Sequence, residues 1–145
     1  MLWMAGNTHQ QIEEFRDPRL GVLQLRRELG CVGTVVIEGS RVEVILGSDG
    51  EAPSEVALQT IVELIDSWSG FRQEIIGFAK SQFDTDDWHD EVDLPDPESW
   101  ALMSIQVLWR DDPQFAMLYF TVDNDERSWF VTVREWRPVE VSYDH

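Results

Sequence analysis

The C-terminal third of the chain constrains the fold most, because apolar and polar residues alternate there in four successive runs between residues 102 and 143. A period of two places neighbouring side chains on opposite faces of a β-strand. Turn-forming residues separate the runs, at residues 111–113, at residues 123–125 and around Pro138. The pattern predicts a four-strand antiparallel meander with one apolar face. The positions expected on that face are Ile105, Val107, Trp109, Ala116, Leu118, Phe120, Val122, Trp129, Val131, Val133, Val139, Val141 and Tyr143.

A sheet with one apolar face must cover that face, and residues 54–83 supply the cover. Ser54 is a good helix cap, and apolar residues then recur at helical spacing on both sides of Gly70, which predicts a stop or a kink there. We therefore expect a helix pair packed against the sheet. The residues expected in the core are Ile61, Leu64, Ile65, Ile75, Val107, Leu118, Phe120, Val131 and Val141.

The N-terminal third adds a hairpin, because residues 34–38 and 41–46 alternate in the same way across Gly39 and Ser40. A glycine at the first turn position favours a type II′ turn. Residues 20–25 fit either a strand or a short helix, and we favour a strand. Residues 8–15 indicate a short helical turn that the Asp17-Pro18 pair ends, within a loosely attached stretch of residues 1–16.

Together these patterns predict one α+β domain over residues 1–145. Its mainly antiparallel sheet, made of the N-terminal hairpin and the C-terminal meander, packs against the helix pair. No stretch is long and apolar enough to span a membrane. The lone cysteine, Cys31, suits a reducing compartment and is expected to be a small buried residue. We therefore expect a cytoplasmic protein.

The charge balance favours a basic protein as the partner. The chain has 28 Asp and Glu against 11 Lys and Arg, which gives a formal net charge of −17. Such a field repels phosphate backbones and anionic lipid surfaces, so we expect neither nucleic acid nor membrane as a partner. A high negative charge also keeps small proteins soluble, and that is the plainer explanation of the composition.

Residues 84–98 differ from the rest of the chain, because they are crowded with carboxylates and contain no lysine or arginine. Like charges at this density repel one another and the prolines oppose regular structure, so we expect a solvated loop. Trp88 in this loop has two interpretations: an aromatic anchor for a partner, or a lid folded back on the helix pair. In the first interpretation the partner-binding residues are Asp84, Asp86, Asp87, Trp88, Asp90, Glu91 and Asp93.

Patterns for catalysis and metal binding are incomplete. Residues 84–95 partly match a calcium loop, but His89 stands where glycine is needed and Pro95 stands in place of the closing glutamate. The three histidines have no paired metal-ligand spacing with one another or with Cys31. A nucleophile with its base and a phosphate-cradling glycine loop are not recognisable. We expect no cofactor, no tightly bound metal and no enzyme activity, and the alternative is an enzyme whose carboxylates bind a divalent metal.

The order of the elements is similar to that of a known group of domains. The matching segments are residues 17–21 (DPRLG), 33–37 (GTVVI), 41–46 (RVEVIL), 48–53 (SDGEAP) and 137–142 (RPVEVS). The chain resembles a group of small acidic bacterial domains of unknown function, some of which are thought to be immunity proteins of toxin systems. The resemblance implies a protein that neutralises a cognate toxin by occupying its basic surface. The alternative is an acidic interaction or regulatory domain without a toxin partner.

Overall fold

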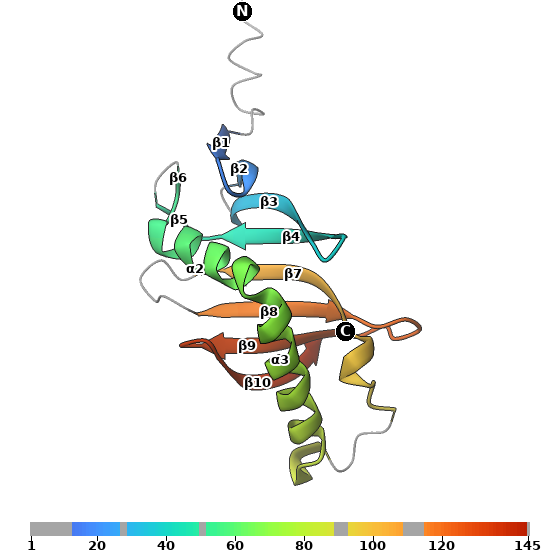
Figure 1. Cartoon of the computed structure of the whole chain (residues 1–145). Coiled ribbons are helices and arrows are strands. Elements are labelled where there is room, and N and C mark those ends of the chain that lie inside the picture. Colours follow the sequence, from blue (N-terminus) through green and yellow to red (C-terminus); the bar gives the residue numbers. More distant parts are fainter. Residues whose placement is uncertain (1–12, 27–28, 50–51, 89–92, 109–114, 145) are drawn as a thin grey trace, which may run out of the picture.

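An eight-stranded sheet with two helices across one face forms the fold in the part of the chain that the structure describes (Figure 1). The structure is a computed structural model that describes residues 13–26, 29–49, 52–88, 93–108 and 115–144. It confirms the α+β class with a mostly antiparallel sheet and two helices. The strands of the sheet, in spatial order, are β1 (Glu13–Asp17), β2 (Gly21–Arg26), β3 (Gly30–Ile37), β4 (Ser40–Leu46), β7 (Ala101–Val107), β8 (Ala116–Thr121), β9 (Ser128–Arg134) and β10 (Arg137–Asp144).

Neighbouring strands are antiparallel except β4 and β7, which are parallel. Parallel neighbours need a long crossover connection, and here the crossover contains α2 (Glu55–Asp66) and α3 (Trp68–Phe83). Both helices lie across the same face of the sheet in Figure 1. A separate two-stranded ladder of β5 (Ser48–Asp49) and β6 (Ala52–Pro53) precedes α2. The single parallel pair therefore places the whole described helical layer on the apolar face.

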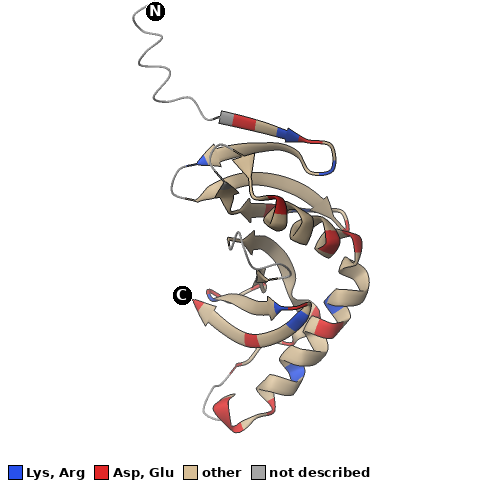
Figure 2. Ribbon diagram, turned by 90° about the vertical axis from the view of Figure 1, so that its left-hand side faces the viewer, with Lys and Arg blue, Asp and Glu red and all other residues tan. Residues whose placement is uncertain are grey.

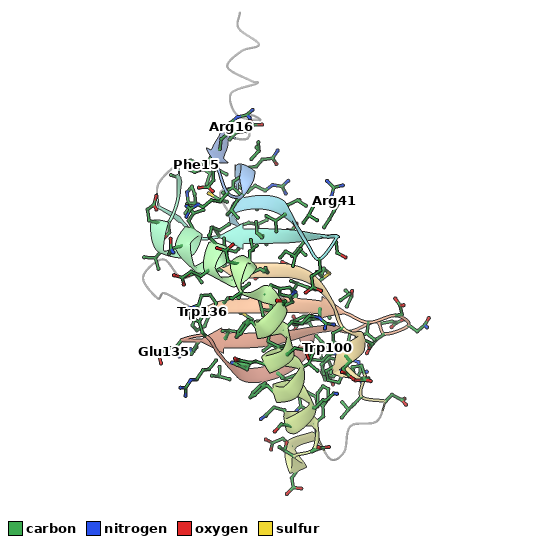
Figure 3. The ribbon with its side chains drawn as sticks, in the orientation of Figure 1. Phe15, Arg16, Arg41, Trp100, Glu135 and Trp136 are labelled. Carbon is green, nitrogen blue, oxygen red and sulfur yellow. The ribbon has the colours of Figure 1, made fainter. Side chains whose placement is uncertain are left out.

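The core lies between the helices and the sheet, and every residue predicted there is buried except Ile65, which is half-buried. Phe120 on β8 is only 2% exposed, and its ring centroid lies 6.5 Å from that of Trp68 and 5.1 Å from that of Trp100. Figure 3 shows Trp100 beside α3, just before β7 begins. Cys31 is fully buried, as expected, and this burial raises the pKa of its thiol.

Two of the N-terminal predictions are wrong. Residues 13–15 belong to strand β1, which pairs with β2, and the remainder of the predicted helical turn lies outside the described residues. Pairing with a neighbouring strand outweighs a weak local helical preference. The β3–β4 hairpin turns on Glu38 and Gly39, with φ of 51° and 81°, and two positive φ angles define a type I′ turn. The choice of a strand for residues 20–25 is confirmed by β2.

Two element boundaries further along the chain also differ from the prediction. Gly70 does not stop the second helix, because α3 begins at Trp68 and runs through it. Pro138 lies inside β10, and the turn before this strand consists of Glu135 and Trp136, both with positive φ. An edge strand such as β10 tolerates proline, which lacks an amide hydrogen, and its pairing with β9 shifts register between Pro138 and Glu140. The predicted turn at 111–113 lies outside the described residues.

The face of the sheet that points away from the helices is mixed in character. It carries polar residues such as Thr34, Gln106 and Thr132 beside half-buried Tyr119 and Phe130. Neither described helix packs on this face, because the buried residues of both belong to the core on the opposite side. Neither of them is long and apolar enough to cross a membrane.

Truncating Phe120 tests the packing of this core. Phe120→Ala is expected to lower the free energy of unfolding by about 3–5 kcal/mol, since it removes a buried ring and leaves a cavity. Val36→Ala is the matched control, because Val36 is 67% exposed on the same sheet. Urea denaturation monitored by circular dichroism measures both variants. A Phe120→Ala variant as stable as the parent would contradict the register of β8.

Candidate functional site

The described residues of the acidic segment, 84–88 and 93–98, contain local structure that the prediction of a solvated loop did not include. After α3 ends at Phe83, the chain forms a short 3₁₀ helix, η1 (Asp86–Trp88), and a second one, η2 (Pro97–Ser99), precedes β7. The Asp96 carboxylate caps η2 by accepting a hydrogen bond from the backbone N–H of Glu98 at 3.0 Å. Pro97 is buried. Local caps and a buried proline hold the segment against the domain, in spite of its charge.

The predicted partner-binding carboxylates lie on the surface wherever the structure describes them. Asp84, Asp86, Asp87 and Asp93 are all exposed, and none of them forms a salt bridge with another described residue. Asp90 and Glu91 lie outside the described residues, so the structure does not place them. Figure 2 shows acidic residues gathered beyond the end of α3, at the lower tip of the molecule.

Trp88 has the second of its two predicted arrangements, a lid folded back on the core. Its ring lies 5.1 Å from that of Phe83 on α3, 5.8 Å from that of Trp129 on β9 and 6.3 Å from that of Tyr143 on β10, measured between ring centroids. The side chain is half-buried. This packing fixes the position of η1 and leaves its two aspartates pointing to solvent.

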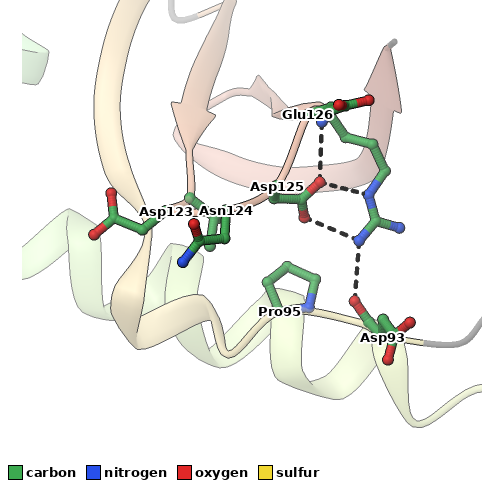
Figure 4. A pocket seen from close by; sticks show the side chains of 8 residues that line it. Asp93, Pro95, Asp123, Asn124, Asp125 and Glu126 are labelled. Carbon is green, nitrogen blue, oxygen red and sulfur yellow. Dashed lines mark hydrogen bonds and ion pairs between the residues drawn. The ribbon is translucent and has the colours of Figure 1, made fainter.

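A hollow of about 580 Å³ lies where the acidic segment meets the turn between β8 and β9 (Figure 4). Asp93 and Pro95 line it from the acidic segment, and residues 122–127 line it from the turn. Of these turn residues, Asp123 and Glu126 are exposed. The hollow is therefore walled by carboxylates from two segments that are far apart in the sequence.

Arg127 joins the two walls of this hollow. Its guanidinium donates to both carboxylate oxygens of Asp125, at 2.8 and 2.9 Å, and to the backbone oxygen of Asp93 at 3.0 Å. It also lies over the rings of Trp129 and Tyr143, with Cζ at 4.7 and 5.3 Å from their centroids. Arg127 thus holds the acidic segment to the sheet by a hydrogen bond to the main chain and by stacking on aromatic rings.

The negative charge of the Asp125 carboxylate is balanced by the Arg127 guanidinium. The hydrogen bond from the Arg127 guanidinium lowers the pKa of the Asp125 carboxyl more than burial raises it. The Trp129 indole N–H adds a further hydrogen bond to this carboxylate at 3.1 Å. Asp93, Asp123 and Glu126 form no salt bridge within the described ranges. The hollow is thus suited to binding a cationic group.

Sequence reasoning found one wall of this hollow and missed the other. Asp93 belongs to the predicted set, whereas Asp123 was noticed only as part of a turn and Glu126 was not singled out. The available signal was the short acidic run Asp123-Asn124-Asp125-Glu126. Only the fold shows that this run lies opposite the earlier acidic segment. Among the described residues, no three His, Cys, Asp or Glu side chains converge as a metal site requires.

Comparisons with protein-family models, with curated proteins and with solved structures find no match for this chain. The geometry and charge of the acidic surface are therefore the basis for the functional proposal.

The Asp125–Arg127 pair should make stability depend on pH in acid. The folded-state pKa of Asp125 is lowered, so its carboxylate contributes stability above about pH 4, the ordinary aspartate pKa, and loses that contribution as the pH falls further. Asp125→Asn is expected to cost about 3 kcal/mol at pH 7, because it removes the charged acceptor of two hydrogen bonds from a largely buried guanidinium. Urea titrations of parent and variant from pH 7 to pH 2 measure this difference. A gap that does not narrow below pH 4 would contradict the assignment.

Trp88 is expected to contribute to stability. Trp88→Ala removes its contacts with Phe83 and Trp129, and a half-buried indole is worth about 2 kcal/mol of unfolding free energy. Trp88→Phe retains an aromatic ring and serves as the matched control, with a smaller loss. Thermal unfolding monitored by near-ultraviolet circular dichroism measures both. Equal melting temperatures for the parent and Trp88→Ala would show that this packing contributes nothing.

Proposed function

We propose that the chain is a protein-binding domain that takes a basic partner on its acidic surface, in the manner of an immunity protein that neutralises a toxin. The acidic surface comprises Asp84, Asp86 and Asp87 on the turn after α3, together with the hollow bordered by Asp93 and Asp123. The observation that carries the proposal is that these exposed carboxylates stand on a packed scaffold and not on a loose loop. The toxin as partner is suggested by the resemblance of the element order.

The scaffold matters because a partner binds with lower affinity when flexible groups must become ordered in the complex. The described carboxylates beside Trp88 and at Asp93 are already held by the contacts of Trp88 and Arg127, so they lose little conformational freedom when a partner docks. Carboxylates fixed on one surface also concentrate the negative electrostatic potential there, which raises the rate of encounter with a positively charged partner. In this mechanism inhibition is steric: the domain covers the basic surface by which the toxin engages its own substrate.

Removing the three carboxylates on the turn tests this proposal. Asp84→Asn, Asp86→Asn and Asp87→Asn together should lower the association rate with the partner by about tenfold at low salt. The effect should shrink as the Debye length falls from about 30 Å at 0.01 M to about 10 Å at 0.1 M salt. The partner to use is the product of the neighbouring gene, co-expressed and then measured by surface plasmon resonance.

The matched control removes the same charge from other surfaces. Glu14→Gln, Glu74→Gln and Glu140→Gln change three exposed carboxylates on β1, α3 and β10. This variant should keep the association rate within about threefold of the parent. Equal loss in both triple variants would mean that only total charge matters. A neighbouring product that does not bind, or whose toxicity is not relieved by co-expression, would refute the immunity function.

A further inference from the structure

A second hollow, of about 450 Å³, lies on the face of the sheet that the described helices leave uncovered. Its position follows from strand register. Ser104 on β7 is paired with Glu43 on β4 and with Tyr119 on β8, so these three side chains form a row on one face. Ser128 on β9 is paired with Asp144 on β10, and both line the same hollow.

A bulge lies at the edge of this hollow. The β7–β8 ladder shifts register between Leu102 and Ser104, which leaves Met103 without a paired residue on β8. Met103 is 40% exposed and lines the hollow. Bulges bend a strand and redirect side chains, and they are frequent beside binding sites. The β-bulge at Met103 therefore coincides with the hollow on this face of the sheet.

Ser104 supplies the second observation. The residue is 4% exposed, and among the described residues its hydroxyl has no hydrogen-bond partner. A buried hydroxyl without a partner is unfavourable for folding, because its hydrogen bonds to water are lost without replacement. Since Ser104 lines the hollow, a bound group that enters there is the natural partner for this hydroxyl.

The charge of the hollow indicates what that group is. Glu43 and Asp144 are exposed on opposite sides of it and form no salt bridge within the described part of the chain. Arg41 lies two residues before Glu43 on the same face, where Figure 3 shows it near the hairpin end of β4, and it does not pair with Glu43. None of the described residues that line the hollow is therefore a cation.

We propose that this hollow binds the guanidinium group of an arginine side chain presented by a protein partner. A guanidinium has five N–H donors in one plane, and the carboxylates of Glu43 and Asp144, the Gln106 amide oxygen and the Ser104 hydroxyl are acceptors around the hollow. The Tyr119 ring offers a surface on which the plane stacks. A lysine ammonium has three donors and no plane, so it satisfies fewer of these groups.

This site shares no residue with the acidic surface beside α3, so either proposal stands or fails without the other. The probe is N-acetyl-arginine N-methylamide, titrated into the full chain at 0.1 M salt and followed by amide chemical shifts. Saturable shifts confined to the parts of β4, β7, β8, β9 and β10 that line the hollow are expected, with an affinity about tenfold above that of the lysine and citrulline analogues. Shifts that do not saturate, or that are equal for the three probes, would overturn the proposal.

Two variants and one control make the test specific. Glu43→Gln with Asp144→Asn should weaken arginine binding by about tenfold. Glu14→Gln with Glu74→Gln removes the same charge from β1 and α3, outside both hollows, and should change it by less than about twofold. Equal weakening in both pairs would overturn the site in favour of a general charge effect.

Ser104→Ala separates a binding role from a structural one. Removing a buried hydroxyl that lacks a partner should leave the melting temperature unchanged or raise it. The same variant should weaken arginine binding by about threefold or more, because one acceptor is lost. Unchanged arginine affinity in this variant would remove Ser104 from the site, and a lowered melting temperature would show that its hydroxyl is structural.

Discussion

The indole of Trp129 is the contact on which the shape of the acidic surface depends. The side chain is fully buried, and its ring centroid lies 5.4 Å from that of Phe83, 5.8 Å from that of Trp88 and 5.0 Å from that of Tyr143. Its N–H also bonds the carboxylate of Asp125. One residue in the middle of the meander therefore holds the end of α3, the turn after it, the last strand and the β8–β9 turn. Each of these elements carries or supports carboxylates.

This aromatic packing opposes the electrostatic repulsion between the carboxylates of the acidic segment. Asp84, Asp86 and Asp87 are close in sequence and all exposed, so their mutual repulsion favours an extended, solvated chain. Stacking around Trp88 and the hydrogen bond from Arg127 to the backbone of Asp93 favour the folded turn. Salt weakens the first effect more than the second, because screening acts on exposed charges and hardly on buried rings. Charge concentrated on a fixed surface is thus compatible with a stable domain.

The sequence predicts the elements that depend on local periodicity. It does not predict the features that depend on contacts between residues far apart in the chain. Alternation between residues 102 and 143 predicted the strands and most of the buried positions, since a period of two is fixed by backbone geometry. It was wrong for Val139, which is 50% exposed where the register of β10 shifts. The parallel pairing of β4 with β7 was not predicted, because the two strands are separated by both helices. Trp88 could be given two roles from sequence, and only its contact with Trp129 distinguishes them. Asp123 was missed for the same reason, since its partner wall lies in another segment.

The irregular pairing of β10 affects whether copies of the domain can associate through their sheet edges. A sheet edge normally offers a continuous row of backbone donors and acceptors, onto which another chain can add a strand. Here Pro138 provides no amide hydrogen, and the register with β9 shifts immediately after it. At the opposite edge, the described strand β1 spans five residues, Glu13–Asp17. Both described borders of the sheet are therefore poor templates for the addition of a strand from another copy of the domain.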